Sequence, residues 1–271
     1  MLRLESETGW WLVTHPDHAR LAGAFAEAWG NARFSPPEPR ASVLLGIRCH
    51  DDGWAARDAA PQITREGKPS AFSTELVGKY SAFEEIDLED YLAVRDRAVA
   101  MMAAQDPYAG LLVSMHTENL LTERADRSTI APEQLPLLDR FLDRQRHLQR
   151  ELRSRSESEP FNLRATGEAI RDHFRLLQAT DNLSLLSCVG YRQPASLLHP
   201  LPLRDGSYTE VAVVPSGERS FHLAPYPFAS APMKVEFPAR HVPGKTFATS
   251  KELQRQFAEA PIASLTVTVT D

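Results

Sequence analysis

The sequence lacks several features that would assign it to a specialised class of protein. Its two cysteines, Cys49 and Cys188, are too few and too far apart for a disulfide framework. No run approaches the roughly 18 consecutive apolar residues that indicate a transmembrane helix. The first residues, MLRLESETGWWLVTH, carry acidic side chains where a secretory signal has a basic start and a long apolar stretch. We therefore expect a cytoplasmic protein without a membrane span.

A surplus of basic residues is also missing. Lys and Arg total 30 and Asp and Glu total 36, which gives a formal net charge of −6. Proteins that bind nucleic acid usually carry a basic patch, so we expect no nucleic-acid partner. A Gly-rich phosphate loop and internal repeats are absent as well. The 271 residues, 42% of them hydrophobic, are enough to bury a substantial core.

Hydrophobic periodicity predicts a mainly helical chain that begins with strands. Two short strands are expected within residues 1–15, on either side of a polar turn. Apolar residues then recur at helical spacing in six segments: 16–30, 41–54, 86–105, 106–125, 131–155 and 165–190. Gly53 and Gly190 are predicted to end the second and the last of these helices. Asp106, directly before a proline, is predicted to cap the fourth.

The pattern changes at about residue 191. Prolines, glycines and short alternating runs such as YTEVAVV, MKVEFPA and ASLTVTVTD are typical of strands joined by turns. We expect a helical body over residues 1–190 and a β-rich extension over residues 191–271, packed on the same domain. The fold class is therefore predicted as α+β, mainly α, with the N-terminal strands pairing with the extension. Residues 55–83 form a long connection, a length typical of lids and binding loops.

Four predicted helices carry potential metal ligands among apolar residues. They are His18 on the first, His50 and Asp51 on the second, His116 on the fourth and Asp181 on the last. Burying any of these groups unpaired would cost several kcal/mol, whereas one divalent cation would satisfy all five. Adjacent residues on a helix diverge by about 100°. The side chains of His50 and Asp51 can nevertheless converge beyond the helix end, as metal bonds of about 2 Å require.

The ligand order His…His-Asp…His…Asp resembles that of the HD-domain superfamily of metal-dependent phosphohydrolases. Four motifs, PDHARLAGAFAEAWG, HDDGW, DPYAGLLVSMH and LLQATDNLSL, together resemble an uncharacterised bacterial domain-of-unknown-function family with an HDxGW signature. This second resemblance extends from about residue 9 to about residue 230. The HD resemblance implies an HD-like helical bundle in which His18, His50, Asp51 and Asp181 hold the cation. It also implies that His116 matches an extra histidine used for a second metal or for phosphate contact.

Further residues are candidates for roles around the cation. Together with His116, the predicted catalytic groups are Asp52 and Gln178. Asp52 either orients a ligand histidine or holds a second cation, or it is a solvated carboxylate at a helix end. Gln178, one turn before Asp181, either points into the same cavity or packs between helices.

Three more residues near the predicted site have open roles. His15, one turn before the first ligand, is either a partner of a ligand histidine or a surface residue at the start of a helix, and we favour the surface role. Arg57 and Lys79, on the long connection, are candidates to meet a substrate phosphate.

The expected function is hydrolysis of a phosphate monoester or diester by water activated on a divalent metal ion. Mixed nitrogen and oxygen ligands suit Mn, Fe, Ni, Co or Zn. A small-molecule phosphate ester is the expected partner, and homo-oligomerisation is left open. Two alternatives also stay open: a di-iron oxygenase, and a non-catalytic protein that binds a ligand on the same scaffold.

Overall fold

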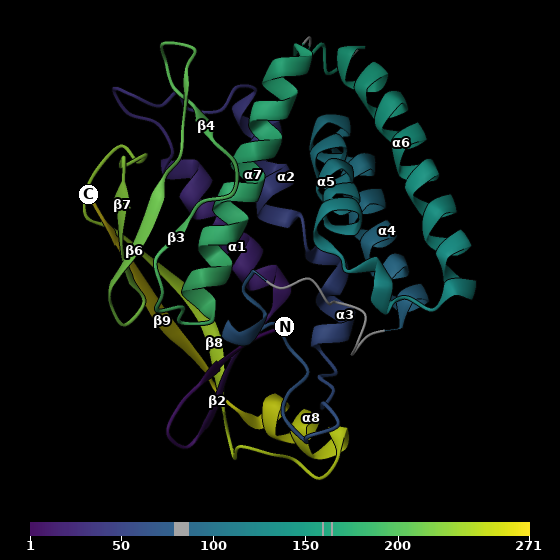
Figure 1. The fold of residues 1–271 in the computed structure, drawn as a ribbon, viewed down its shortest axis with the longest axis vertical. Helices are drawn as coiled ribbons and strands as arrows, with labels where there is room; N and C mark the ends of the chain where they lie inside the picture. Colours follow the sequence, from purple (N-terminus) through teal and green to yellow (C-terminus); the bar gives the residue numbers. More distant parts are fainter. Residues whose placement is uncertain (79–86, 159, 164) are drawn as a thin grey trace.

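Helices and a twisted β-sheet form two adjoining layers in the computed structural model (Figure 1). The structure describes residues 1–78, 87–158, 160–163 and 165–271. Its α-helices are α1 (His15–Ala28), α2 (Arg40–Cys49), α3 (Ala55–Asp58), α4 (Leu88–Gln105), α5 (Pro107–Asn119), α6 (Leu135–Glu157), α7 (Gly167–Cys188) and α8 (Ser250–Glu259). The predicted α+β class is confirmed.

The strands of the described residues come from both ends of the chain. They are β1 (Leu2–Glu5), β2 (Gly9–Val13), β3 (Ala195–Ser196), β4 (Leu201–Pro202), β5 (Tyr208–Thr209), β6 (Ala212–Gly217), β7 (Ser220–Ala224), β8 (Met233–Pro243) and β9 (Ile262–Thr270). Seven of them form one sheet in the order β1-β2-β8-β9-β7-β6-β3. Its pairs are antiparallel except for β7 with β9. Because β2 pairs with β8, with Trp10 opposite Val242, the predicted pairing of the two ends is confirmed.

Local sequence explains where the helices begin and end. The Thr14 hydroxyl accepts from the backbone N–H of Asp17 and caps α1. Asp106 caps α5 as predicted, since its carboxylate accepts from the N–H groups of Tyr108 and Ala109 at 2.8 and 2.9 Å. Gly190 follows α7 with φ +63°, the left-handed backbone expected of a residue that ends a helix.

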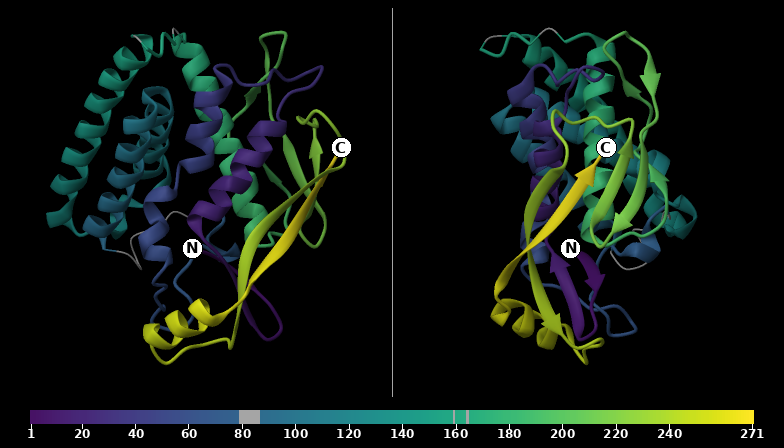
Figure 2. Two further views of the ribbon diagram at one scale, coloured as in Figure 1. Left: turned by 180° about the vertical axis from the view of Figure 1, so that it is seen from behind. Right: turned by 90° about the vertical axis from the view of Figure 1, so that its left-hand side faces the viewer.

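Helix α1 joins the two layers. It packs against α2 and α7 on one side and against β8 of the sheet on the other, and Figure 2 shows it between the sheet and the other helices. One apolar cluster includes Phe25 of α1, Leu177 of α7 and Val267 of β9, all fully buried. The helices and the sheet therefore share a core.

Two predictions about the elements were wrong in part. Helix α2 ends at Cys49 rather than at Gly53, and a 3₁₀ turn, η1 (Asp52–Trp54), follows it. Helix α8 was not predicted, because it is a short polar segment inside the β-rich region and buries only Leu253 and Phe257. Among the described residues, no helix is both long enough and apolar enough to cross a membrane.

Candidate metal centre

The early end of α2 places His50 and Asp51 at a corner of the backbone. His50 still has helical dihedral angles (φ −58°, ψ −25°), but Asp51 leaves the helix (φ −114°, ψ 15°). The two side chains are therefore not held about 100° apart, as those of neighbouring residues in a continuous helix would be. His50 Nε2 lies 3.8 Å from Asp51 Oδ2.

Glycine is required two residues later, at Gly53. The turn η1 packs directly on α4, and a Cβ at Gly53 would overlap the carbonyl oxygen of Val94. The HDxGW signature thus combines two candidate ligands with the one residue type that lets their turn approach the neighbouring helix.

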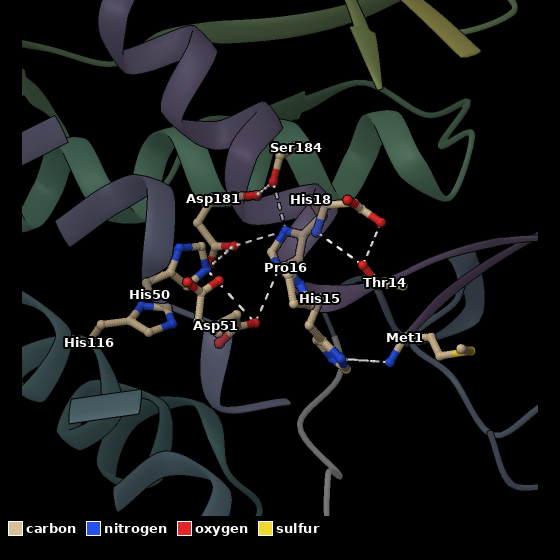
Figure 3. A network of polar contacts seen from close by, with 12 residues as sticks. Met1, Thr14, His15, Pro16, His18, His50, Asp51, His116, Asp181 and Ser184 are labelled. Atoms are coloured by element: carbon tan, nitrogen blue, oxygen red, sulfur yellow. Dashed lines mark hydrogen bonds and ion pairs between the residues drawn. The ribbon is translucent and has the colours of Figure 1, made fainter. Parts of the chain in front are cut away.

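The structure brings all five predicted ligands together (Figure 3). His18 Nε2 lies 3.0 Å from Asp51 Oδ2, and His50 Nε2 lies 3.3 Å from Asp181 Oδ1. The ring centroids of His50 and His116 are 5.0 Å apart. All five side chains are buried, and they come from α1, the end of α2, α5 and α7.

Ser184 determines which nitrogen of His18 faces the cluster. Its hydroxyl donates to the carbonyl oxygen of Asp181 at 2.8 Å, so it accepts from Nδ1–H of His18 at 2.9 Å. In a neutral imidazole, Nε2 then carries a lone pair, which faces the carboxylate of Asp51. Two lone pairs at 3.0 Å repel each other, so a proton or a cation is needed between them.

His50 presents its Nε2 atom to the cluster. Its Nδ1 donates to the carbonyl oxygen of Ile47 at 2.8 Å. Within the described residues, Nε2 is buried and meets no partner in hydrogen-bonding geometry. Burial opposes a charged imidazole here, but the carboxylates of Asp51 and Asp181 outweigh it and raise the pKa of His50 to about 9. This position attracts positive charge.

His116 is held by Gln178. Burial lowers the pKa of His116 to about 3, so its imidazole is neutral at pH 7, which is the form that binds metals. Its Nδ1 lies 2.5 Å from Nε2 of Gln178. If the oxygen and nitrogen of the amide exchange places, the amide oxygen accepts from Nδ1–H of His116. Nε2 of His116 is then left as a candidate ligand. Gln178 therefore acts on the cluster through His116.

A buried arginine, Arg95, was missed by the sequence reasoning. Its Nη1 lies 2.5 Å from Asp51 Oδ1, and its Nε donates to the hydroxyl of Tyr91 at 3.1 Å. Burial works against the Asp51 carboxylate, but the charges of Arg95 and His50 hold its pKa well below the usual value. A signal was present, because Tyr91, Arg95 and Val99 share one apolar face of α4 at a spacing of four residues.

The favoured surface role for His15 was wrong. Its ring stacks on Trp54 with centroids 4.4 Å apart, and its Nδ1 lies 3.0 Å from Asp58 Oδ1. Burial lowers the pKa of His15 to about 4. Asp58 also accepts from the α-amino group of Met1 at 2.8 Å. His15 therefore belongs to the wall of the site and not to the surface.

Asp52 lies apart from the other predicted catalytic groups. It forms an ion pair with Arg20, with Nη2 to Oδ2 at 3.1 Å. Asp52 is also absent from the described residues that line the cavity next to the ligands. Its predicted catalytic role gains no support from this position.

A cavity of about 510 Å³ opens beside the ligands. His18, Asp51, His116 and Asp181 contribute to its wall, as does Arg57 from the long connection. Lys79 lies outside the described residues. The predicted ligands thus face a space large enough for a small molecule.

A family profile described as protein of unknown function (DUF3891) matches residues 1–244. The chain belongs to the DUF3891 family. Comparisons with curated proteins and with solved structures returned no match. All five candidate ligands lie within the DUF3891 match, and the predicted membership of a domain-of-unknown-function family is confirmed. The similarity to HD-domain enzymes stays a prediction.

Proposed function

We propose that this DUF3891 protein is a metal-dependent hydrolase of small-molecule phosphate esters. The observation that carries the proposal is the buried cluster of three imidazoles and two carboxylates beside a cavity. The predicted cytoplasmic location is retained as part of the proposal.

The candidate ligand atoms form two overlapping groups that share His50, one with His18 and Asp51 and the other with His116 and Asp181, and the spacing within each group fits a divalent cation. Ligand atoms about 2.1 Å from one ion lie roughly 3.0 Å apart at a right angle and roughly 3.4 Å apart at a tetrahedral angle. The distances of 3.0 Å from His18 Nε2 to Asp51 Oδ2 and 3.3 Å from His50 Nε2 to Asp181 Oδ1 agree with this spacing. A cation would also satisfy His50 Nε2, which has no partner in hydrogen-bonding geometry among the described residues. Mn, Fe, Ni, Co and Zn all accept such ligands.

Two contacts favour one ion over two. The Nδ1 atom of His50 donates to the carbonyl oxygen of Ile47, so only Nε2 of this imidazole can bind a metal ion. The Oδ1 atom of Asp51 is engaged by Arg95, so this carboxylate does not bridge two ions. These contacts weigh against the di-iron alternative.

The protein itself would supply orientation and charge. Ser184, the carbonyl of Ile47 and Gln178 orient the three imidazoles, and Arg95 holds the carboxylate of Asp51. The positively charged guanidinium group of Arg57, which lines the cavity, would contact the substrate phosphate. When bound, a divalent ion supplies Lewis-acid activation of water and of the phosphoryl group. In this proposal His116 is a ligand and Gln178 is a positioning residue.

Asp51 and Asp52 are adjacent in the sequence, so a substitution of each provides a test and its matched control. Protein purified without chelator is analysed for metals, then reconstituted and assayed against phosphomonoesters and phosphodiesters. We expect about one ion per chain and hydrolysis in the wild type, loss of both in Asp51→Asn, and retention of both in Asp52→Asn. Absence of stoichiometric metal from the wild type after reconstitution would falsify the proposal. Stoichiometric metal without hydrolysis of any ester would favour the non-catalytic alternative.

A further inference from the structure

The cavity extends beyond the ligands, and most of its additional wall is apolar. Three helical segments that face the cluster carry an apolar or aromatic cavity residue four positions from a polar one. On α7, Leu185 follows Asp181; after α5, Leu120 follows His116; on α4, Tyr91 precedes Arg95. Residues four apart lie on one helix face. The apolar wall therefore begins directly beside the ligands.

The connection before α4 and the segment after α7 complete this wall. Phe72 and Val77 line the cavity from the connection, and Tyr191 lines it from the segment after α7. These side chains are half-buried and pack against the main apolar core with only part of their surface. The remaining surface is available to a ligand in the cavity.

Some polar groups of the wall away from the ligands are engaged by the protein itself, whereas Trp54 Nε1 and Asn182 Oδ1 are buried without a hydrogen-bond partner among the described residues. Gln62 donates to the carbonyl oxygen of Ala60 at 2.9 Å. Asp58 is held by His15 and by the α-amino group of Met1. A base or sugar has several polar edges that need partners when buried. An apolar group has none, and the mostly apolar lining of the cavity favours it.

We propose that the substrate is a phosphate ester of an apolar alcohol. Its phosphoryl group lies at the His and Asp ligands, and its alkyl or aryl group lies against Leu185, Leu120 and Phe72. The cavity volume of about 510 Å³ is within the usual range for a small-molecule site. Hydrolysis joins the oxygen of water to phosphorus and breaks the bond from phosphorus to the ester oxygen. The leaving oxygen takes a proton, which gives phosphate and the free alcohol.

This inference rests on the proposed function, because the metal site is taken to bind the phosphoryl group. Two kinds of probe are therefore needed, phosphonates for binding and phosphate esters for hydrolysis. Non-hydrolysable methylphosphonate and octylphosphonate test binding to the metal-reconstituted full chain by calorimetry. Each buried methylene contributes up to about fourfold in affinity, so we expect octylphosphonate to bind at least about 100-fold more tightly. We also expect kcat/KM to rise from methyl to butyl to octyl phosphate and to be lowest for adenosine monophosphate.

Leu185→Ala tests the position of the apolar group. We expect it to weaken octylphosphonate about tenfold and methylphosphonate much less, because a methyl group buries far less surface against Leu185 than an octyl chain does. Met101→Ala, at the exposed surface of α4, is the matched control and should change neither affinity.

The outcomes separate the two proposals. Tight binding of octylphosphonate without hydrolysis of any ester supports the apolar site and overturns the hydrolase. Hydrolysis with equal kcat/KM for methyl and octyl phosphate, or with a preference for adenosine monophosphate, overturns the apolar site and supports the hydrolase.

Discussion

At the scale of single residues, the chemistry of the candidate site depends on partners that determine proton positions and charge. Ser184 leaves Nε2 of His18 to face the cluster, and the carbonyl of Ile47 does the same for His50. Such partners orient metal-binding imidazoles, and their loss typically costs 10- to 100-fold in metal affinity. Substitutions of Arg95 and of Gln178 test the roles of two of these partners.

Arg95→Met is expected to weaken metal binding and to destabilise the fold. Removing one member of a buried ion pair leaves the carboxylate of Asp51 uncompensated, which costs about 3–5 kcal/mol. Urea denaturation of the metal-free protein measures this loss, and metal titration measures affinity. Arg20→Met is the control, because its partner Asp52 lies outside the cavity; it should change unfolding free energy by about 1 kcal/mol or less. Equal effects of the two substitutions would contradict the role of Arg95.

Gln178→Glu and Gln178→Leu together test how the amide faces His116. If the amide oxygen accepts from Nδ1–H, glutamate keeps an acceptor and metal affinity is retained. Leucine removes the acceptor, and we expect a 10- to 100-fold loss of metal affinity. Isothermal titration with Mn²⁺ or Zn²⁺ distinguishes the variants. Loss of affinity in both would show that the amide nitrogen, and not its oxygen, faces the imidazole.

At the scale of elements, the site depends on the end of α2 and on how the following turn packs. The turn η1 leaves the helical path at Asp51 and approaches α4 closely enough to exclude any side chain at Gly53. This approach also brings the turn beside the helix that carries Arg95. The position of Asp51 is therefore set by packing between two elements.

Gly53→Ala is expected to lower the free energy of unfolding by about 1–3 kcal/mol, the usual cost of overpacking. It should also weaken metal binding, because the added methyl group pushes the turn that carries Asp51 away from α4. Chemical denaturation and metal titration measure the two effects. Gly217→Ala is the control, since its added Cβ would meet Ser220 only at 3.5 Å, an ordinary contact. Unchanged metal affinity in Gly53→Ala would show that the turn tolerates the shift.

At the scale of the whole molecule, the candidate ligands connect segments that are far apart in sequence. His18 lies on the helix that contacts the sheet, and Asp181 lies 163 positions later, on the helix that ends at the segment leading to the sheet. A cation held by all of them binds the folded chain only, because the unfolded chain does not bring the ligands together. Metal binding should therefore stabilise the entire fold.

Removal of metal with a chelator is expected to lower Tm, and excess metal should restore it. At a free metal concentration 100 times Kd, binding contributes about 2.7 kcal/mol to stability. Differential scanning calorimetry of the wild type with and without EDTA measures the shift. Asp51→Asn should show no shift with EDTA. A Tm of the wild type that is independent of chelator and of added metal would contradict a metal site of this kind.

Much of the fold could be predicted because its signals are local. Apolar periodicity marked α1 and α4 to α7, Asp106 and Gly190 marked helix ends, and alternating runs marked the later strands. Predictions failed where local preference was overridden by packing. The sequence pattern predicts that helix α2 continues to Gly53. The helix ends earlier because the turn that follows it packs closely on α4. Helix α8 has too few apolar residues to stand out from the turns around it.

The sequence by itself determined the types of the candidate ligands and their order on four segments, because a buried imidazole or carboxylate among apolar residues demands a partner. Only the tertiary structure decided that Arg95 neutralises Asp51, that Ser184 and Ile47 orient the imidazoles, and that an apolar cavity adjoins them. These contacts join residues from different elements, apart from the local bond to Ile47. Distances between elements follow from how they pack, and the spacing of residues along the chain does not contain them.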